Sequence, residues 1–214
     1  MNISLLSHPI AAVKIADLRN TLTQGEQFRK VLSDLTTILA IYATQDLEIT
    51  RNEIETPLER TNGYMLKGKI AVAPVLRAGL GMVDSFLNLV PTAVVSHIGL
   101  SRDEQSLEPS VYYSGSGLKG ISRCYVLDPM LATGGSAVEA CSIVKKWDVK
   151  QIVYIGIIGT MEGVENLSKA HPDVPIHLAA VMGVPVVALE GKHFVDRVST
   201  TLLKQANLSQ FVAK

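Results

Sequence analysis

Short, nearly continuous runs of Val, Ile and Ala set the fold that this chain can adopt. Most runs are followed, after a short gap, by a segment whose apolar residues recur at helical spacing. Strands that are apolar on both faces are typical of a parallel sheet with helices on both sides. The pattern therefore predicts an α/β fold. The expected strands are 69–75, 93–98, 123–127, 151–158 and 176–181, and the expected helices lie around 79–89, 136–147 and 162–171, after a mostly helical segment over 8–45.

The composition agrees with a single domain over residues 1–214 and limits its partners. The chain is 47% hydrophobic and 19% charged, so it can bury a large core. Its 20 basic and 20 acidic residues argue against a general nucleic-acid or membrane-surface footprint. Cys124 and Cys141 lie in apolar stretches without metal-ligand spacing, and no secretory signal or membrane span is evident. We therefore expect a cytoplasmic protein with two buried, reduced thiols.

A carboxylate, a glycine-rich turn and a helix start follow directly after the strand expected at 123–127. The first amides of a helix have no intrahelical partners, and the helix dipole adds positive potential there. Thr133 and Ser136 add hydroxyl donors, and adjacent glycines let the backbone close around an anion. Asp128 can reach a sugar hydroxyl or a metal bound to it. The segment predicts a site for a phosphorylated sugar, made by Asp128, Pro129, Met130, Leu131, Ala132, Thr133, Gly134, Gly135 and Ser136.

Two arginines follow other strands that should end at the same edge of the sheet. Arg77 lies in a glycine-rich turn, where its planar guanidinium could form forked bonds with a pyrophosphate. The alternative is a helix-opening arginine paired with an acid such as Asp84. Arg102 lies in a charged turn that, taken alone, could equally be solvated surface. Because ligands of open parallel sheets bind at the carboxyl ends of the strands, we expect both arginines near residues 128–136.

These segments resemble the uracil phosphoribosyltransferases, which belong to the type I phosphoribosyltransferases. The family reads DPMLATGGS at its ribose-phosphate loop and LRAGLGM at its pyrophosphate loop, as do residues 128–136 and 76–82 here. The resemblance implies a parallel sheet flanked by helices, with a small hood built from terminal segments. It also implies conversion of uracil and 5-phosphoribosyl pyrophosphate (PRPP) to UMP and pyrophosphate, a step of pyrimidine salvage.

The resemblance also implies the roles of individual residues. Asp128, Arg77 and Arg102 would be catalytic, and the two arginines would bind PRPP together with residues 128–136. Mg²⁺ would arrive on the pyrophosphate of PRPP, and no direct protein ligand of the metal is predicted. The family further implies a homodimer or a higher homo-oligomer. Glu162, in a turn that resembles the family's P-E-G, either acts near the ligand or simply opens a helix.

The C-terminal segment departs from the family. Where the family has a glycine-rich stretch whose backbone binds uracil, the region Met182 to Asp196 reads MGVPVVALEGKHFVD. Glycines with positive φ shape such loops, so their replacement leaves the base-binding residues unassigned. Two alternatives therefore stay open: a phosphoribosyltransferase for another base, and a PRPP-binding homologue that is regulatory rather than catalytic.

Overall fold

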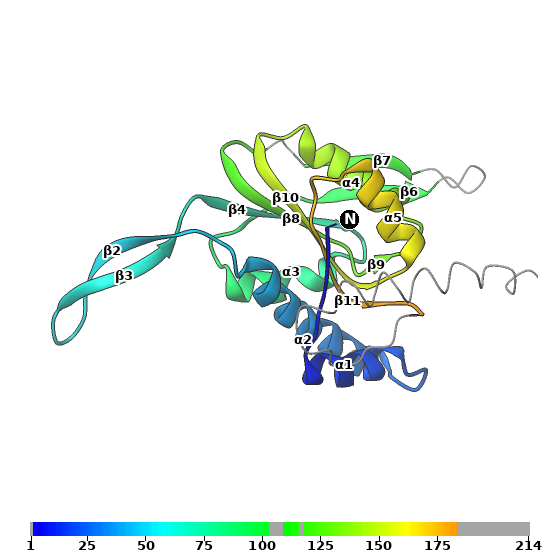
Figure 1. The fold of residues 1–214 in the computed structure, drawn as a ribbon, viewed down its shortest axis with the longest axis horizontal. Coiled ribbons are helices and arrows are strands. Elements are labelled where there is room, and N and C mark those ends of the chain that lie inside the picture. Colours follow the sequence, from blue (N-terminus) through cyan, green and yellow to red (C-terminus); the bar gives the residue numbers. More distant parts are fainter. Residues whose placement is uncertain (1, 103–108, 116–117, 184–214) are drawn as a thin grey trace, which may run out of the picture.

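The computed structural model describes residues 2–102, 109–115 and 118–183 (Figure 1). The strands of its central sheet are β1 (Ile3–Leu5), β4 (Lys69–Leu76), β5 (Val94–Val95), β6 (Ile98–Arg102), β7 (Pro109–Ser114), β8 (Ile121–Leu127), β9 (Met130–Leu131), β10 (Val149–Gly159) and β11 (Ile176–Val181). The strand order is β1-β11-β10-β8-β4-β6-β7, with β5 on β4 and β9 on β10. Apart from the antiparallel pair of β6 and β7, these strands pair in parallel. The predicted parallel α/β sheet is confirmed.

Helices cover both faces of this sheet (Figure 1). Helices α1 (Pro9–Arg19), α2 (Gly25–Thr44) and α3 (Leu80–Leu89) share one core cluster with the sheet, and α4 (Gly135–Lys145) and α5 (Met161–Ala170) share the other. Successive residues of β4 alternate between the clusters. Ile70 and Val72 join the first, and Ala71 and Ala73 join the second. A strand buried on both faces needs apolar residues at every position, which explains the continuous runs in the sequence.

The helical segment predicted at 8–45 is confirmed as two helices. In α2 the side chains of Leu32, Leu35 and Leu39 are buried at helical spacing against the sheet. The chain leaves α1 at Asn20, whose backbone is extended, and re-enters a helix at Gly25. None of the described helices is long and apolar enough to cross a bilayer.

Three parts of the fold differ from the sequence prediction. The strand expected at 93–98 is divided into β5 and β6, and the phosphate-site segment contains the short strand β9. A separate antiparallel hairpin, β2 (Ile49–Glu55) with β3 (Arg60–Leu66), extends away from the sheet (Figure 1). The side chains of this hairpin are exposed along nearly its whole length, so its sequence lacks the alternation of a half-buried strand. The C-terminal part of the expected hood lies outside the described residues.

Both cysteines are fully buried free thiols of the same core cluster. Cys124 lies on β8 and Cys141 on α4. Burial raises the pKa of each thiol to about 12, so almost no reactive thiolate forms near neutral pH. We expect an aromatic disulfide reagent at pH 8 to label both cysteines in guanidinium chloride, and neither in the folded protein. Rapid labelling of the folded protein would contradict this burial.

Candidate active site

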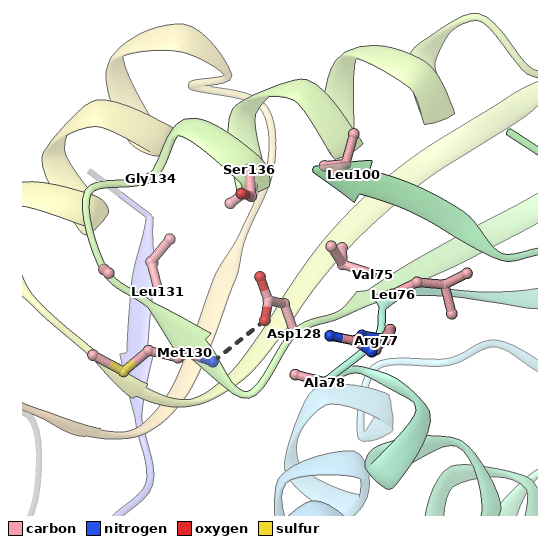
Figure 2. A pocket seen from close by; sticks show the side chains of 12 residues that line it. Val75, Leu76, Arg77, Ala78, Leu100, Asp128, Met130, Leu131, Gly134 and Ser136 are labelled. Atoms are coloured by element: carbon pink, nitrogen blue, oxygen red, sulfur yellow. Dashed lines mark hydrogen bonds between the residues drawn. The ribbon is translucent and has the colours of Figure 1, made fainter. Parts of the chain in front are cut away.

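Strands β4 and β8 end at one edge of the sheet, and residues at these ends, together with Leu100 of the neighbouring β6, surround a cavity of about 240 Å³ (Figure 2). Leu127, the last residue of β8, pairs with Pro74, two residues before the end of β4, so these two strands end at a similar level. Ile98, the first residue of β6, pairs with Val75, so β6 begins beside this end of β4 and continues past it to Arg102. Arg77 and Asp128 therefore come to the same cavity, as the strand pattern predicts. The lining residues are Val75, Leu76, Arg77, Ala78, Leu100, Asp128, Met130, Leu131, Ala132, Gly134, Ser136 and Ala137.

The glycine-rich turn leads directly into α4. Gly134 has a φ of 88°, a left-handed conformation that L side chains rarely adopt, and a Cβ there would lie 2.9 Å from the carbonyl oxygen of Gly163. Helical bonding starts when the Val138 amide donates to the Gly134 carbonyl at 2.8 Å. The earlier amides of the helix precede this bond and are available to an anion. A helix start of this kind suits an anion such as a phosphate, and we refer to residues 128–136 as the phosphate cradle.

Asp128 comes directly after β8 and is held from two sides. The Met130 amide donates to a carboxylate oxygen of Asp128 at 3.4 Å (Figure 2). The Tyr154 hydroxyl donates to the Asp128 backbone carbonyl, also at 3.4 Å. Burial holds the pKa of Tyr154 well above its usual range, and the nearby charge of Asp128 adds to the shift. Tyr154 therefore keeps its proton and remains a donor. The half-buried carboxylate of Asp128 lines the cavity.

Arg77 lies in the tight turn between β4 and α3. The turn is pressed against the strand ends, since a Cβ on Gly79 would lie 2.4 Å from the Leu127 carbonyl oxygen and 2.7 Å from the Val75 nitrogen. The peptide bond between Leu76 and Arg77 is cis. Within the described part of the chain, the ion pairs do not include one between Arg77 and Asp84. Arg77 instead lines the cavity together with Asp128 (Figure 2).

Arg102, Met182 and Glu162, the other predicted residues near the site, are not among the residues that line the cavity in the described structure. Arg102 is the last residue of β6; its side chain is outside the described structure, and Leu100 is the residue of this strand that lines the cavity. Met182 is exposed just after β11, and the rest of the region Met182 to Asp196, from residue 184 onward, is not described. Glu162 is exposed in the first turn of α5 and is absent from the cavity lining in the described structure, which favours a helix-start role.

Among residues 2–102, 109–115 and 118–183, no group of three or more His, Cys, Asp or Glu side chains could hold a metal.

Three residues around α5 support the phosphate cradle and were not identified from the sequence. The Thr160 hydroxyl donates to the Ala132 carbonyl at 2.6 Å, and the Asn166 side chain donates to the Thr133 carbonyl at 2.8 Å. Gly163 allows the helix to approach this closely. A threonine before a helix is a recognisable N-cap signal, but neither side-chain bond is local in sequence.

Comparison with known proteins agrees with this geometry. The sequence model of the uracil phosphoribosyltransferase family matches residues 5–183. A protein of Roseiflexus castenholzii named uracil phosphoribosyltransferase is 47% identical over 175 residues, which cover 81% of this chain and 84% of that protein. The protein of the same name in Ureaplasma urealyticum is 44% identical over 180 residues, which cover 83% and 86%.

Solved structures share the fold of this chain. The AQ2163 protein of Aquifex aeolicus superposes with a TM-score of 0.79 at 32% identity, covering 84% of this chain and 86% of that chain. A hypoxanthine-guanine phosphoribosyltransferase of Bacillus anthracis has a TM-score of 0.50 at 10% identity, covering 72% and 81%, a likeness of fold alone. Since the family match spans residues 5–183 and relatives are more than 40% identical over most of the chain, the protein belongs to the uracil phosphoribosyltransferase family.

Proposed function

We propose that this protein transfers the 5-phosphoribosyl group of PRPP to uracil, giving UMP and pyrophosphate. One observation carries the proposal: Asp128, Arg77 and the cradle before α4 line a single cavity in a chain of this family. The cradle would anchor the 5′-phosphate, and the Arg77 guanidinium would hold the pyrophosphate. Arg102, at the end of β6, is proposed as a second pyrophosphate ligand because it matches the arginine that the family has at this position.

The reaction is a displacement at the anomeric carbon of the ribose. The bond from this carbon to the pyrophosphate oxygen breaks with its electron pair, while a ring nitrogen of uracil forms the new bond and loses its proton. Positive charge grows on the ribose ring before the new bond is complete. The Asp128 carboxylate would stabilise this charge and orient the ribose hydroxyls. Because both ends of PRPP would be held, much of the rate enhancement would come from orientation.

We propose Mg²⁺ as the cofactor, entering with PRPP. Among the described residues the cavity offers one carboxylate, Asp128, and this fits an ion that is usually held by one or two carboxylates, substrate phosphates and water. When bound, Mg²⁺ would neutralise charge on the leaving pyrophosphate. The protein's own contribution at this end would be Arg77, whose permanent charge faces the same anion.

The family match ends at residue 183, where the divergent C-terminal segment begins. A phosphoribosyltransferase for another base is therefore the second candidate function, and a regulatory PRPP-binding homologue is the third.

The direct experiment incubates purified full-length protein with PRPP, Mg²⁺ and single bases, and follows release of pyrophosphate. We expect release that depends on uracil. Release with another base alone would replace uracil as the acceptor. PRPP binding by calorimetry without turnover on any base would overturn the enzymatic proposal.

We also propose a cytoplasmic location and self-association. The two buried, unpaired thiols support a reducing compartment.

Self-association is supported by the hairpin of β2 and β3, which carries apolar side chains on both faces. Tyr64 is 64% exposed on one face, and Met65 is 53% exposed on the other. A two-stranded hairpin is marginally stable alone, and exposed apolar surface of this kind marks contact sites. The proposed occupant of the hairpin surface is a second copy of the chain.

Replacing Tyr64 and Met65 together by Ser is expected to convert the oligomer to a monomer. The sheet core should remain folded, because both residues lie outside the two core clusters. Sedimentation velocity would measure the mass, and circular dichroism the fold. Leu22→Ser is the matched control: Leu22 lies between α1 and α2, away from the hairpin, is 80% exposed, and should leave the mass unchanged when replaced. A wild-type protein that sediments as a monomer would contradict the proposal.

A further inference from the structure

Four carbonyl groups of the phosphate cradle, those of Pro129, Leu131, Ala132 and Thr133, accept hydrogen bonds from β10, from Thr160 or from α5. These bonds fix the direction in which each carbonyl points. The backbone donors are the amides of Ile157 and Ile158 to the Pro129 carbonyl, at 3.1 Å each, and the amide of Thr160 to the Leu131 carbonyl, at 2.9 Å. Two side chains continue this row of donors along the loop.

These side chains are Thr160 and Asn166. The Thr160 hydroxyl reaches the Ala132 carbonyl at 2.6 Å, and the Asn166 side-chain nitrogen reaches the Thr133 carbonyl at 2.8 Å. In a planar trans peptide the carbonyl and the next amide point in opposite directions. Holding these two carbonyls toward α5 therefore turns the amides of Thr133 and Gly134 away from α5.

The direction of these amides matters for an anion. Ala132 and Gly134 line the cavity beside Asp128. An amide that points into the cavity attracts a phosphate, whereas a carbonyl turned into the same space would repel it. A glycine-containing turn has enough conformational freedom to flip its peptide planes unless something fixes them.

We propose that Thr160 and Asn166 are positioning residues of the 5′-phosphate site: they fix the peptide planes on both sides of Thr133 so that the loop amides face the phosphate. This inference rests on the proposed function, because the phosphate it concerns is that of PRPP. Neither side chain needs to touch the substrate. Both act through the loop carbonyls that they hold.

The packing of α5 supports this role. A Cβ on Gly163 would lie 2.3 Å from the Ala132 carbonyl oxygen and 2.8 Å from that of Leu131, so the first turn of α5 rests directly on the loop backbone. Thr160 caps α5 by accepting a bond from the Gly163 amide at 3.1 Å, which ties the helix start to the loop. The structure thus places α5 as a rigid support behind the cradle.

Asn166 gives the cleaner test because it is exposed and lies outside both core clusters. Asn166→Ala is expected to raise the KM for PRPP about tenfold, the effect of losing one hydrogen bond that orders the site. The kcat and the KM for uracil should stay near wild type, and the melting temperature should be unchanged. Glu165→Ala, at the adjacent exposed position of α5, is the control and should leave all these values unchanged.

Thr160 supplies the rescue experiment. Thr160→Val keeps the shape and removes the hydroxyl, so it should raise the KM for PRPP and also lower the melting temperature through the lost helix cap. Thr160→Ser restores the hydroxyl and should recover the KM for PRPP.

The outcomes separate this inference from the proposed function. Wild-type protein that releases no pyrophosphate with uracil would remove the proposed function, and calorimetry with PRPP and Mg²⁺ would still compare the variants. An Asn166→Ala protein that binds PRPP like wild type would overturn the inference. So would equal losses in kcat and in the KM for both substrates, because a general structural defect would explain them.

Discussion

Replacing Asp128 by Asn is expected to lower kcat by about 10²–10³-fold, the size of effect seen when one electrostatic contact to a transition state is removed. Asn has the same shape as Asp but lacks the negative charge that would stabilise the developing positive charge on the ribose. Pyrophosphate release at saturating PRPP and uracil measures the change. PRPP binding should weaken less than turnover, because the cradle and Arg77 would still hold both ends of the substrate.

The fold should survive this change, because the two hydrogen bonds described for residue 128 do not need a negative charge. The amide of Met130 can donate to the side-chain oxygen of Asn as it does to the carboxylate, and Tyr154 donates to the backbone carbonyl of residue 128. Asp84→Asn is the control: it removes one exposed carboxylate from α3, outside the cavity lining of the described structure, and should leave kcat unchanged. An Asp128→Asn protein with wild-type kcat would exclude the role assigned to the carboxylate.

The parts of the site that could be predicted from sequence are those governed by local rules. Asp128 and Arg77 each follow a strand that is recognisable by its continuous apolar run, and parallel strands bring their carboxyl ends to one edge. The cradle was predictable because a helix start with glycines has a known affinity for anions. Each inference needed only a short segment and the order of the elements.

The supporting contacts could not be predicted, because they depend on how the elements pack. Asn166 is an exposed polar residue in the middle of a helix, and nothing in its neighbourhood of the sequence indicates that it holds the carbonyl of Thr133. Strand β9 likewise exists because residues 130 and 131 pair with β10, and the hairpin of β2 and β3 has too little buried surface to leave a pattern. Tertiary contacts decide the first two, whereas the hairpin lacks the buried face that would mark it in the sequence.

Replacing Gly134 by Ala is expected to raise the KM for PRPP by about tenfold to a hundredfold, since small displacements of an oriented site are costly. Two causes act together. The φ of 88° disfavours any residue with a Cβ by about 1–2 kcal/mol, and the new methyl group would lie 2.9 Å from the Gly163 carbonyl oxygen. That oxygen belongs to backbone at the start of α5, so relief of the contact must move the cradle or the helix that supports it. Steady-state kinetics with varied PRPP measures the loss.

Gly120 separates the two causes. Its φ of 67° is also left-handed, but a Cβ there would meet nothing within 4 Å, and the residue is exposed at a turn before β8. Gly120→Ala should therefore lower the melting temperature through backbone strain alone and leave the KM for PRPP unchanged. If Gly134→Ala shows the same pattern, the cradle tolerates the methyl group, and the close support of the loop by α5 does not control phosphate binding. If only Gly134→Ala weakens PRPP binding, the contact between the loop and α5 is what sets the geometry of the phosphate site.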